Sequence, residues 1–169
     1  MSLHEAIGDY GPALALLGVA VTLWVNGGRE ERRRRRENHA RAIRAAVAYG
    51  EMPYRIRRRR CEPEQAAAER ARLSDDFSEV QVELAACEAL LRADPDLEVR
   101  DVYKALVDSL RRDAGGLASE AWRTKPVVSD DQMGLPDVHV ALSEVRDAQV
   151  ACETAMASST RPWAPSTSS

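Results

Sequence analysis

The segment LSDDFSEVQVELAACEALLRADPD, residues 73–96, decides the fold, because its apolar residues recur at alternating spacings of four and three. Such spacing places one side chain per turn on a single face of an α-helix, and charged residues fill the positions between. The segment therefore predicts an amphipathic helix over residues 63–93 with a coiled-coil seam on one side. The seam consists of Leu73, Phe77, Val80, Leu84, Cys87 and Leu91.

The end of this segment, residues 94–96, has the composition of a tight turn that reverses the chain. Two further segments, 97–122 and 136–157, also carry apolar residues at helical spacing. Because the turn is short, the two helices that flank it should form an antiparallel hairpin. The sequence thus predicts an all-α fold, with an antiparallel bundle of three helices over residues 61–157 and a disordered tail at 158–169.

Upstream of the bundle, the segment LWVNGGREERRRRREN, residues 23–38, changes abruptly from an apolar run to five consecutive arginines. Residues 10–28 contain no charged side chain, and nineteen helical residues extend about 28 Å, close to the roughly 30 Å of a bilayer core. A secretory signal carries its basic residues before the apolar run, whereas here they follow it. The run therefore predicts a single transmembrane helix at residues 10–28, with a buried core helix as the alternative.

The charges beside this span predict its orientation. Arginines next to a span stay on the cytoplasmic side, so residues 1–9 should form a short extracytoplasmic tail and the bundle should be cytoplasmic. This arrangement places the chain in the plasma (inner) membrane. Small residues within the span would let two copies of it approach closely. The candidate span-packing face comprises Gly11, Ala15, Gly18 and Thr22.

Residues 29–60 form a basic segment with thirteen arginines against four glutamates. A helix is predicted from residue 30 to residue 49, ended by Gly50 and followed by a loop at Met52 and Pro53. This helix is a candidate fourth member of the bundle. Its arginines would attract anionic headgroups, and the phosphates of a nucleic acid would attract them as well. The candidate contacts are Arg32, Arg33, Arg34, Arg35, Arg36, Arg55, Arg57, Arg58, Arg59 and Arg60.

Motifs that carry chemistry are absent from the sequence. It has no GxxxxGKS/T loop, no GxGxxG and no CxxC, and neither His39 nor His139 shows the ExxH spacing of metal-binding bundles. Cys87 and Cys152 fall on predicted seams and should be small core residues, while Cys61 lies in the basic loop with arginines nearby. We therefore expect that the chain is not an enzyme and that it binds no cofactor or metal.

The connections between the helices leave two alternatives open. Gly115 and Gly116 should bend or split the helix at residues 97–122. The connection at residues 123–136 is long for a bundle and is either a binding segment or a plain linker. Trp122 beside it either covers the core or anchors a partner.

These features together predict the function of a membrane-anchored helical interaction or scaffold protein. Its expected partners are the anionic headgroups of the lipid bilayer and either a cytoplasmic protein or a second copy of the chain. The alternative is a membrane-tethered nucleic-acid-binding protein that uses the arginine runs. Few aromatic residues are interleaved with those arginines, and a position beside a span already explains them, so the first function is preferred.

Overall fold

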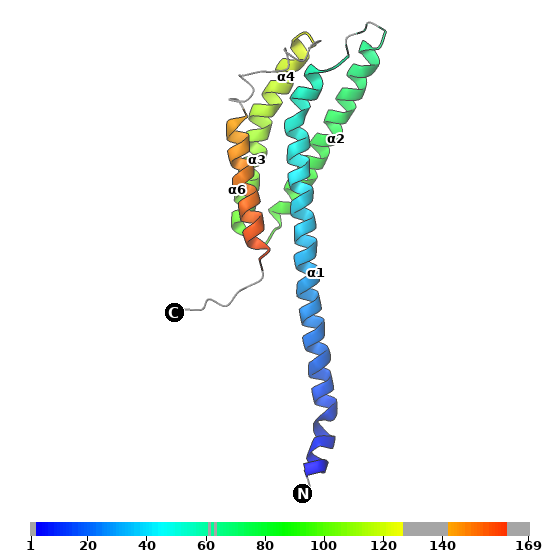
Figure 1. Cartoon of the computed structure of the whole chain (residues 1–169), viewed down its shortest axis with the longest axis vertical. Coiled ribbons are helices and arrows are strands. Elements are labelled where there is room, and N and C mark those ends of the chain that lie inside the picture. Colours follow the sequence, from blue (N-terminus) through cyan, green and yellow to red (C-terminus); the bar gives the residue numbers. More distant parts are fainter. Residues whose placement is uncertain (1–2, 61, 63, 127–141, 162–169) are drawn as a thin grey trace. The chain divides into compact units, whose positions relative to one another are not determined.

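The computed structural model describes the backbone of residues 3–60, 62, 64–126 and 142–161, and the side chains of these residues from position 26 onward. The described residues are mostly helical and contain no strand, which confirms the predicted all-α class (Figure 1). A π-helical turn, Leu110–Ala114, joins α3 to α4. The helices are α1 (Leu3–Arg57), α2 (Ala66–Arg92), α3 (Leu97–Ser109), α4 (Gly115–Arg123) and α6 (Ser143–Ser159).

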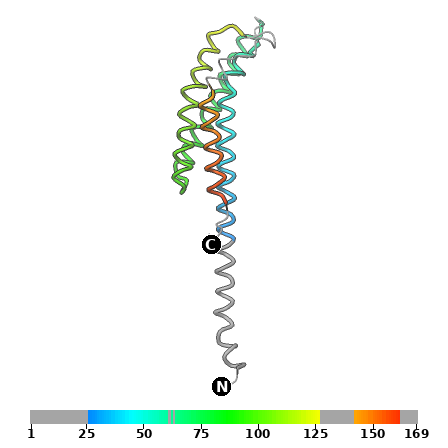
Figure 2. The backbone as a smooth tube through the Cα atoms, turned by 60° about the vertical axis from the view of Figure 1, so that its left-hand side comes forward, coloured from blue at the N-terminus to red at the C-terminus, as the bar shows by residue number. Residues whose placement is uncertain are grey.

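The chain divides into two units, residues 1–37 and residues 38–169. Helix α1 contributes residues to both. Figure 2 shows the second unit as a bundle in which the end of α1 and the other helices lie alongside one another. The helix predicted only as a candidate fourth member is thus part of the bundle, because its buried residues belong to the same core as those of α2, α3 and α6.

The predicted end of the basic helix was wrong. Helix α1 continues through Gly50 and Pro53 to Arg57, so the loop expected at Met52 and Pro53 is helical. Glycine and proline inside a helix are unfavourable, and proline also removes one backbone hydrogen bond. The continued helix buries Met52 and Ile56 completely, however. The stability gained from this packing outweighs the low helix propensity of Gly50 and Pro53.

No helix in the described part of the chain is long and apolar enough to cross a membrane. The transmembrane helix predicted at residues 10–28 is therefore not supported. The structure gives its backbone as helical, but the side chains of residues 10–25 lie outside the described residues, as do those of the predicted tail at 1–9. The same holds for the candidate span-packing residues Gly11, Ala15, Gly18 and Thr22.

The core of the second unit confirms the predicted seam of α2. Leu73, Leu84, Cys87 and Leu91 are buried, and Phe77 and Val80 pack half-buried against the same core. Helix α1 supplies a comparable face to the bundle, with residues spaced three or four apart. The buried apolar residues of α1 are Ala42, Ala45, Ala46, Tyr49, Met52 and Ile56.

The ends of the helices agree with the sequence in part. Asp96 caps α3, because its carboxylate accepts hydrogen bonds from the backbone N–H groups of Glu98, at 3.0 Å, and Val99. Helix α2 begins at Ala66, three residues later than predicted. Helix α6 ends at Ser159, two residues later than predicted, while residues 136–141 and 162–169 lie outside the described part of the chain.

Candidate functional site

The first arginine run lies in the first unit and is largely exposed. Arg32, Arg33, Arg34 and Arg36 are exposed, and Arg35 is half-buried. The carboxylate of Glu37 lies 3.0 Å from Arg33, a surface ion pair of the kind that contributes little to stability. The run therefore presents several guanidinium groups to solvent, as contact with a polyanion requires.

The second run, in contrast, contains arginines that hold the bundle together. Arg55 forms an ion pair with Asp76 on α2, and Asp76 also accepts from Arg72 at 3.0 Å. Arg59 donates to the backbone carbonyls of Ala121, at 2.8 Å, and Thr124, at 2.6 Å.

These two carbonyls lie at the C-terminal end of α4, where backbone oxygens have no partner within the helix. The Arg59 guanidinium also lies over the ring of Trp122, 5.6 Å from its centroid. Trp122 itself packs on the core cluster that contains Met52 and Ile56. Trp122 thus covers the core, one of the two alternatives that its position suggested.

The remaining arginines of the second run make fewer contacts with the other helices of the bundle. Arg58 and Arg60 are exposed, and Arg60 donates to the amide oxygen of Gln65 at 3.3 Å. Arg57 is half-buried. The two runs lie in different units, and the second run exposes fewer guanidinium groups to solvent than the sequence suggested.

A buried pair, His39 and Asp94, was missed by the sequence analysis. The Nε2 atom of His39 lies 3.0 Å from Oδ2 of Asp94, and both side chains are almost completely buried. The other carboxylate oxygen accepts from the backbone N–H of Asp96 at 2.9 Å, and Arg100 donates to the Asp94 carbonyl. The pair therefore fastens α1 to the turn between α2 and α3.

A signal for this pair was present in the sequence. His39 precedes Ala42, Ala46 and Tyr49 at spacings of three and four, so it falls on the buried face of α1. Within the described residues, Nδ1 of His39 is buried and has no hydrogen-bond partner. This buried histidine therefore serves the packing of the bundle. The described residues contain no group of three or more potential ligands that could hold a metal ion.

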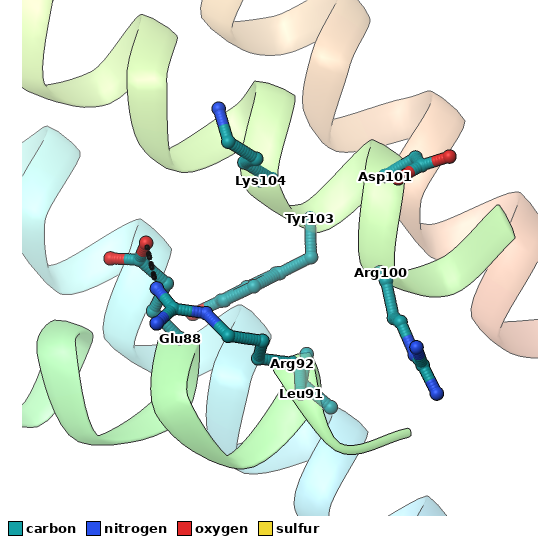
Figure 3. A pocket seen from close by; sticks show the side chains of 7 residues that line it. All are labelled: Glu88, Leu91, Arg92, Arg100, Asp101, Tyr103 and Lys104. Atoms are coloured by element: carbon teal, nitrogen blue, oxygen red, sulfur yellow. Dashed lines mark hydrogen bonds and ion pairs between the residues drawn. The ribbon is translucent and has the colours of Figure 1, made fainter. Parts of the chain in front are cut away.

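A cleft of about 300 Å³ lies between α2 and α3 (Figure 3). The ring of Tyr103 forms part of its floor, and burial raises the pKa of this phenol well above its ordinary value. Glu88 accepts from Arg92 at 3.2 Å and from Arg111 at 2.7 Å, so its charge is already compensated. The lining residues are Glu88, Leu91, Arg92, Arg100, Asp101, Tyr103 and Lys104.

The charged groups of this cleft do not converge. Figure 3 shows Lys104, Asp101 and Arg100 pointing in three different directions from the Tyr103 ring. The Lys104 amine pairs instead with Asp108, at 2.7 Å. An anion-binding site needs several donors aimed at one point, so this arrangement does not form one.

The two described cysteines are core residues, as predicted. Cys87 and Cys152 are both fully buried. Burial raises the pKa of the Cys87 thiol and raises that of Cys152 to about 12, so neither is a thiolate at neutral pH. Both thiols are therefore packed in the core in their protonated form, and Cys61 lies outside the described residues.

A groove of about 200 Å³ separates α1 from α6. Its floor is apolar and includes the buried Leu110 and Leu142, while Glu51 and Arg146 stand on its two walls. Val47, on the α1 wall, keeps 44% of its surface exposed. The groove is therefore an apolar surface bordered by charge, which suits a macromolecular contact better than a reaction.

Comparison with known proteins adds no functional information. No protein-family model matches the chain, and the searches of curated proteins and of solved structures find no match either.

Proposed function

We propose that this chain is a membrane-anchored helical interaction protein whose bundle faces the cytoplasm. One observation carries the proposal: the arginine run that follows the apolar residues 10–28 is exposed, with Arg32, Arg33, Arg34 and Arg36 all open to solvent. Guanidinium groups directly beside an apolar span hold that side of a protein on the cytoplasmic face and attract anionic headgroups. The anchor itself rests on the sequence of residues 10–28.

The bundle supports the interaction role rather than a catalytic one. Its buried ionisable groups serve packing: His39 bonds Asp94, and Cys87 and Cys152 are protonated core thiols. Arg59, in the second run, is occupied with the end of α4, which reduces the charge that this run can offer to a nucleic acid. The first run is thus the principal contact for anionic lipid in this proposal.

The test is a protease-protection experiment on intact cells. A tag fused after Ser169 should be protected from external protease, and a tag fused before Met1 should be digested. Leu17→Arg should abolish membrane retention, because a charge at the centre of a span costs roughly 2.5 kcal/mol or more. Leu97→Arg is the matched control, because Leu97 is 66% exposed in the bundle, and this variant should stay in the membrane.

Three results would contradict the proposal. Wild-type chain that leaves the membrane on washing would exclude the anchor, and inverted protection of the two tags would exclude the orientation. Full-length protein that binds RNA or duplex DNA near physiological salt more tightly than anionic vesicles would favour the nucleic-acid tether.

A further inference from the structure

We propose that the cationic end of the bundle binds an acidic peptide segment of a partner protein, with one apolar side chain of that segment in a cleft beside Trp122. The proposal rests on the interaction function described above, because it names the kind of partner that the bundle takes. The cationic end comprises the described residues of 54–74 and of 117–126. These segments hold the end of α1, the beginning of α2 and the end of α4, which lie at one end of the bundle (Figure 1).

Two arginines fasten these helix ends to one another. Arg59, which follows α1, donates to the carbonyl oxygens of Ala121, at 2.8 Å, and Thr124, at 2.6 Å, at the end of α4. Arg60 donates to the side-chain amide oxygen of Gln65, at 3.3 Å, directly before α2. Residues that are distant in sequence therefore form one surface.

A cleft of about 300 Å³ lies on this surface. Arg70 and Ser74 line it from α2, and the half-buried ring of Trp122 lines it from α4. A cleft of this volume is at the lower end of the range for small-molecule sites and has room for one side chain of a partner. It offers that side chain an apolar wall with a guanidinium and a hydroxyl group beside it.

Several exposed cations of this surface have no acidic partner. None of them forms an ion pair with another described residue, so their charge is available to a partner. Arg58, for example, donates to the backbone carbonyl of Tyr54, at 3.3 Å, which carries no charge. Carboxylates of a bound segment would complement these cations, and such complementarity steers association and selects the partner. The cations are Arg58, Arg70, Arg123 and Lys125.

A layer of lipid headgroups fits this surface less well than a peptide does. Proteins that lie on a membrane insert protruding apolar side chains into the headgroup boundary. Trp122 is recessed instead, because it packs on the core cluster that contains Met52 and Ile56, and the guanidinium of Arg59 lies over its ring. The surface therefore accepts an apolar side chain rather than supplying one.

A nucleic acid also fits this surface less well. Glu62, Glu64 and Glu120 are exposed among the cations, and each strand of a duplex carries a negative charge about every 3.4 Å, so its phosphates would meet these carboxylates. Stacking of bases needs an open aromatic face, whereas Trp122 is half-buried and Arg59 lies over it. A peptide with fewer charges along its length can place its carboxylates at the cations alone.

The experiment measures fluorescence anisotropy of labelled synthetic peptides with the full-length chain in a nonionic detergent, near physiological salt. In every sample Arg32, Arg33, Arg34 and Arg36 are replaced by glutamine, so that the first run contributes no binding. The probe is a peptide in which one leucine stands between two runs of glutamate. We expect it to bind, a peptide with serine in place of the leucine to bind more weakly, and a peptide with glutamine in place of glutamate not to bind.

Charge reversals test the cations. Arg70→Glu combined with Arg123→Glu should weaken binding of the leucine peptide about tenfold, because each change replaces an attraction by a repulsion. Arg123→Glu combined with Lys125→Glu is a second pair with the same expected loss. The charge-matched control is Lys104→Glu combined with Arg161→Glu, since both residues are exposed and lie outside the cationic end. This control should bind within about twofold of the unreversed chain, because salt screens distant charges.

Filling the cleft tests the apolar contact. Ser74→Trp should weaken binding of the leucine peptide to the level of the serine peptide and leave the serine peptide unchanged. Circular dichroism checks that each variant remains helical. Equal binding of the leucine and serine peptides, equal loss with the control pair, or no loss with either reversed pair would overturn the proposal. Tighter binding of single-stranded RNA or of soluble glycerophosphoserine, lost in the same reversed pairs, would overturn it in favour of that ligand.

The outcome is separable from that of the proposed function, because peptide binding is measured in detergent and anchoring in intact cells. A chain that stays in the membrane but does not bind the leucine peptide contradicts only the peptide site. A chain that binds the peptide but washes off the membrane contradicts only the anchor.

Discussion

At the scale of single residues, the pairing of His39 with Asp94 shows how a polar group is accommodated in the core. The imidazole Nε2 and the carboxylate lie 3.0 Å apart inside the bundle. A buried carboxylate without a partner is costly, so the histidine is needed wherever the aspartate is retained. Asp94 is retained because its other oxygen holds the backbone N–H of Asp96 in the turn between α2 and α3.

We therefore expect His39→Ala to lower the free energy of unfolding by about 1 to 3 kcal/mol, because it removes the imidazole partner of the buried Oδ2 atom of Asp94. Urea unfolding followed by far-ultraviolet circular dichroism measures the change. Lys104→Ala is the control, since its ion pair with Asp108 is exposed and should contribute little. Equal destabilisation by the two substitutions would show that burial of the pair is unimportant.

At the scale of elements, the spacing of apolar residues in the sequence predicted where the helices lie, but it predicted their ends poorly. The seam of α2 was predictable because spacings of four and three are visible within one segment of the chain. The continuation of α1 through Gly50 and Pro53 was not, because burial of Met52 and Ile56 depends on residues distant in sequence. The helix predicted at residues 97–122, which was expected to bend or split at Gly115 and Gly116, is divided by a π-helical turn, and α4 begins at Gly115.

The two neighbouring glycines of α4 give a matched test of packing against helix propensity. A Cβ atom at Gly116 would have no neighbour within 4 Å, so Gly116→Ala should stabilise the bundle by up to about 1 kcal/mol. A Cβ atom at Gly115 would lie 3.1 Å from the Tyr49 hydroxyl, so Gly115→Ala should gain less or be destabilising. Thermal unfolding of both variants measures the difference, and a larger gain at Gly115 would contradict this account.

At the scale of the whole molecule, long-range pairing separates arginines that look alike in the sequence. Arg59 contacts Ala121 and Thr124, and Arg55 contacts Asp76, but nothing in the basic runs themselves marks these partners. The candidate contacts of the second run were therefore identified from charge alone, and part of them proved to be structural. The His39–Asp94 pair, separated by more than fifty residues, was missed for the same reason.

The bundle should need the end of α1 in order to fold. A fragment that begins at Asn38 should be helical and unfold cooperatively, whereas one that begins at Cys61 should not. The shorter fragment lacks the buried side chains of Met52 and Ile56, and loss of each large core side chain costs about 2 to 5 kcal/mol, against a usual total of 5 to 15 kcal/mol. Thermal melts of both fragments decide this, and a sharp melt of the shorter fragment would refute it.

The π-helical turn at Leu110–Ala114 also affects how the chain tolerates insertions and deletions. A π turn bonds residues five apart instead of four, so it accommodates one residue more than an α turn at the same place. Residues before it contribute to one core cluster, through Leu106 and Val107, and residues after it to another, through Ala118 and Ala121. Deleting one residue within the turn would rotate α4 by about 100° relative to α3 and direct Ala118 and Ala121 away from their cluster. The packing of both clusters therefore depends on the one additional residue that the π turn contains relative to an α turn.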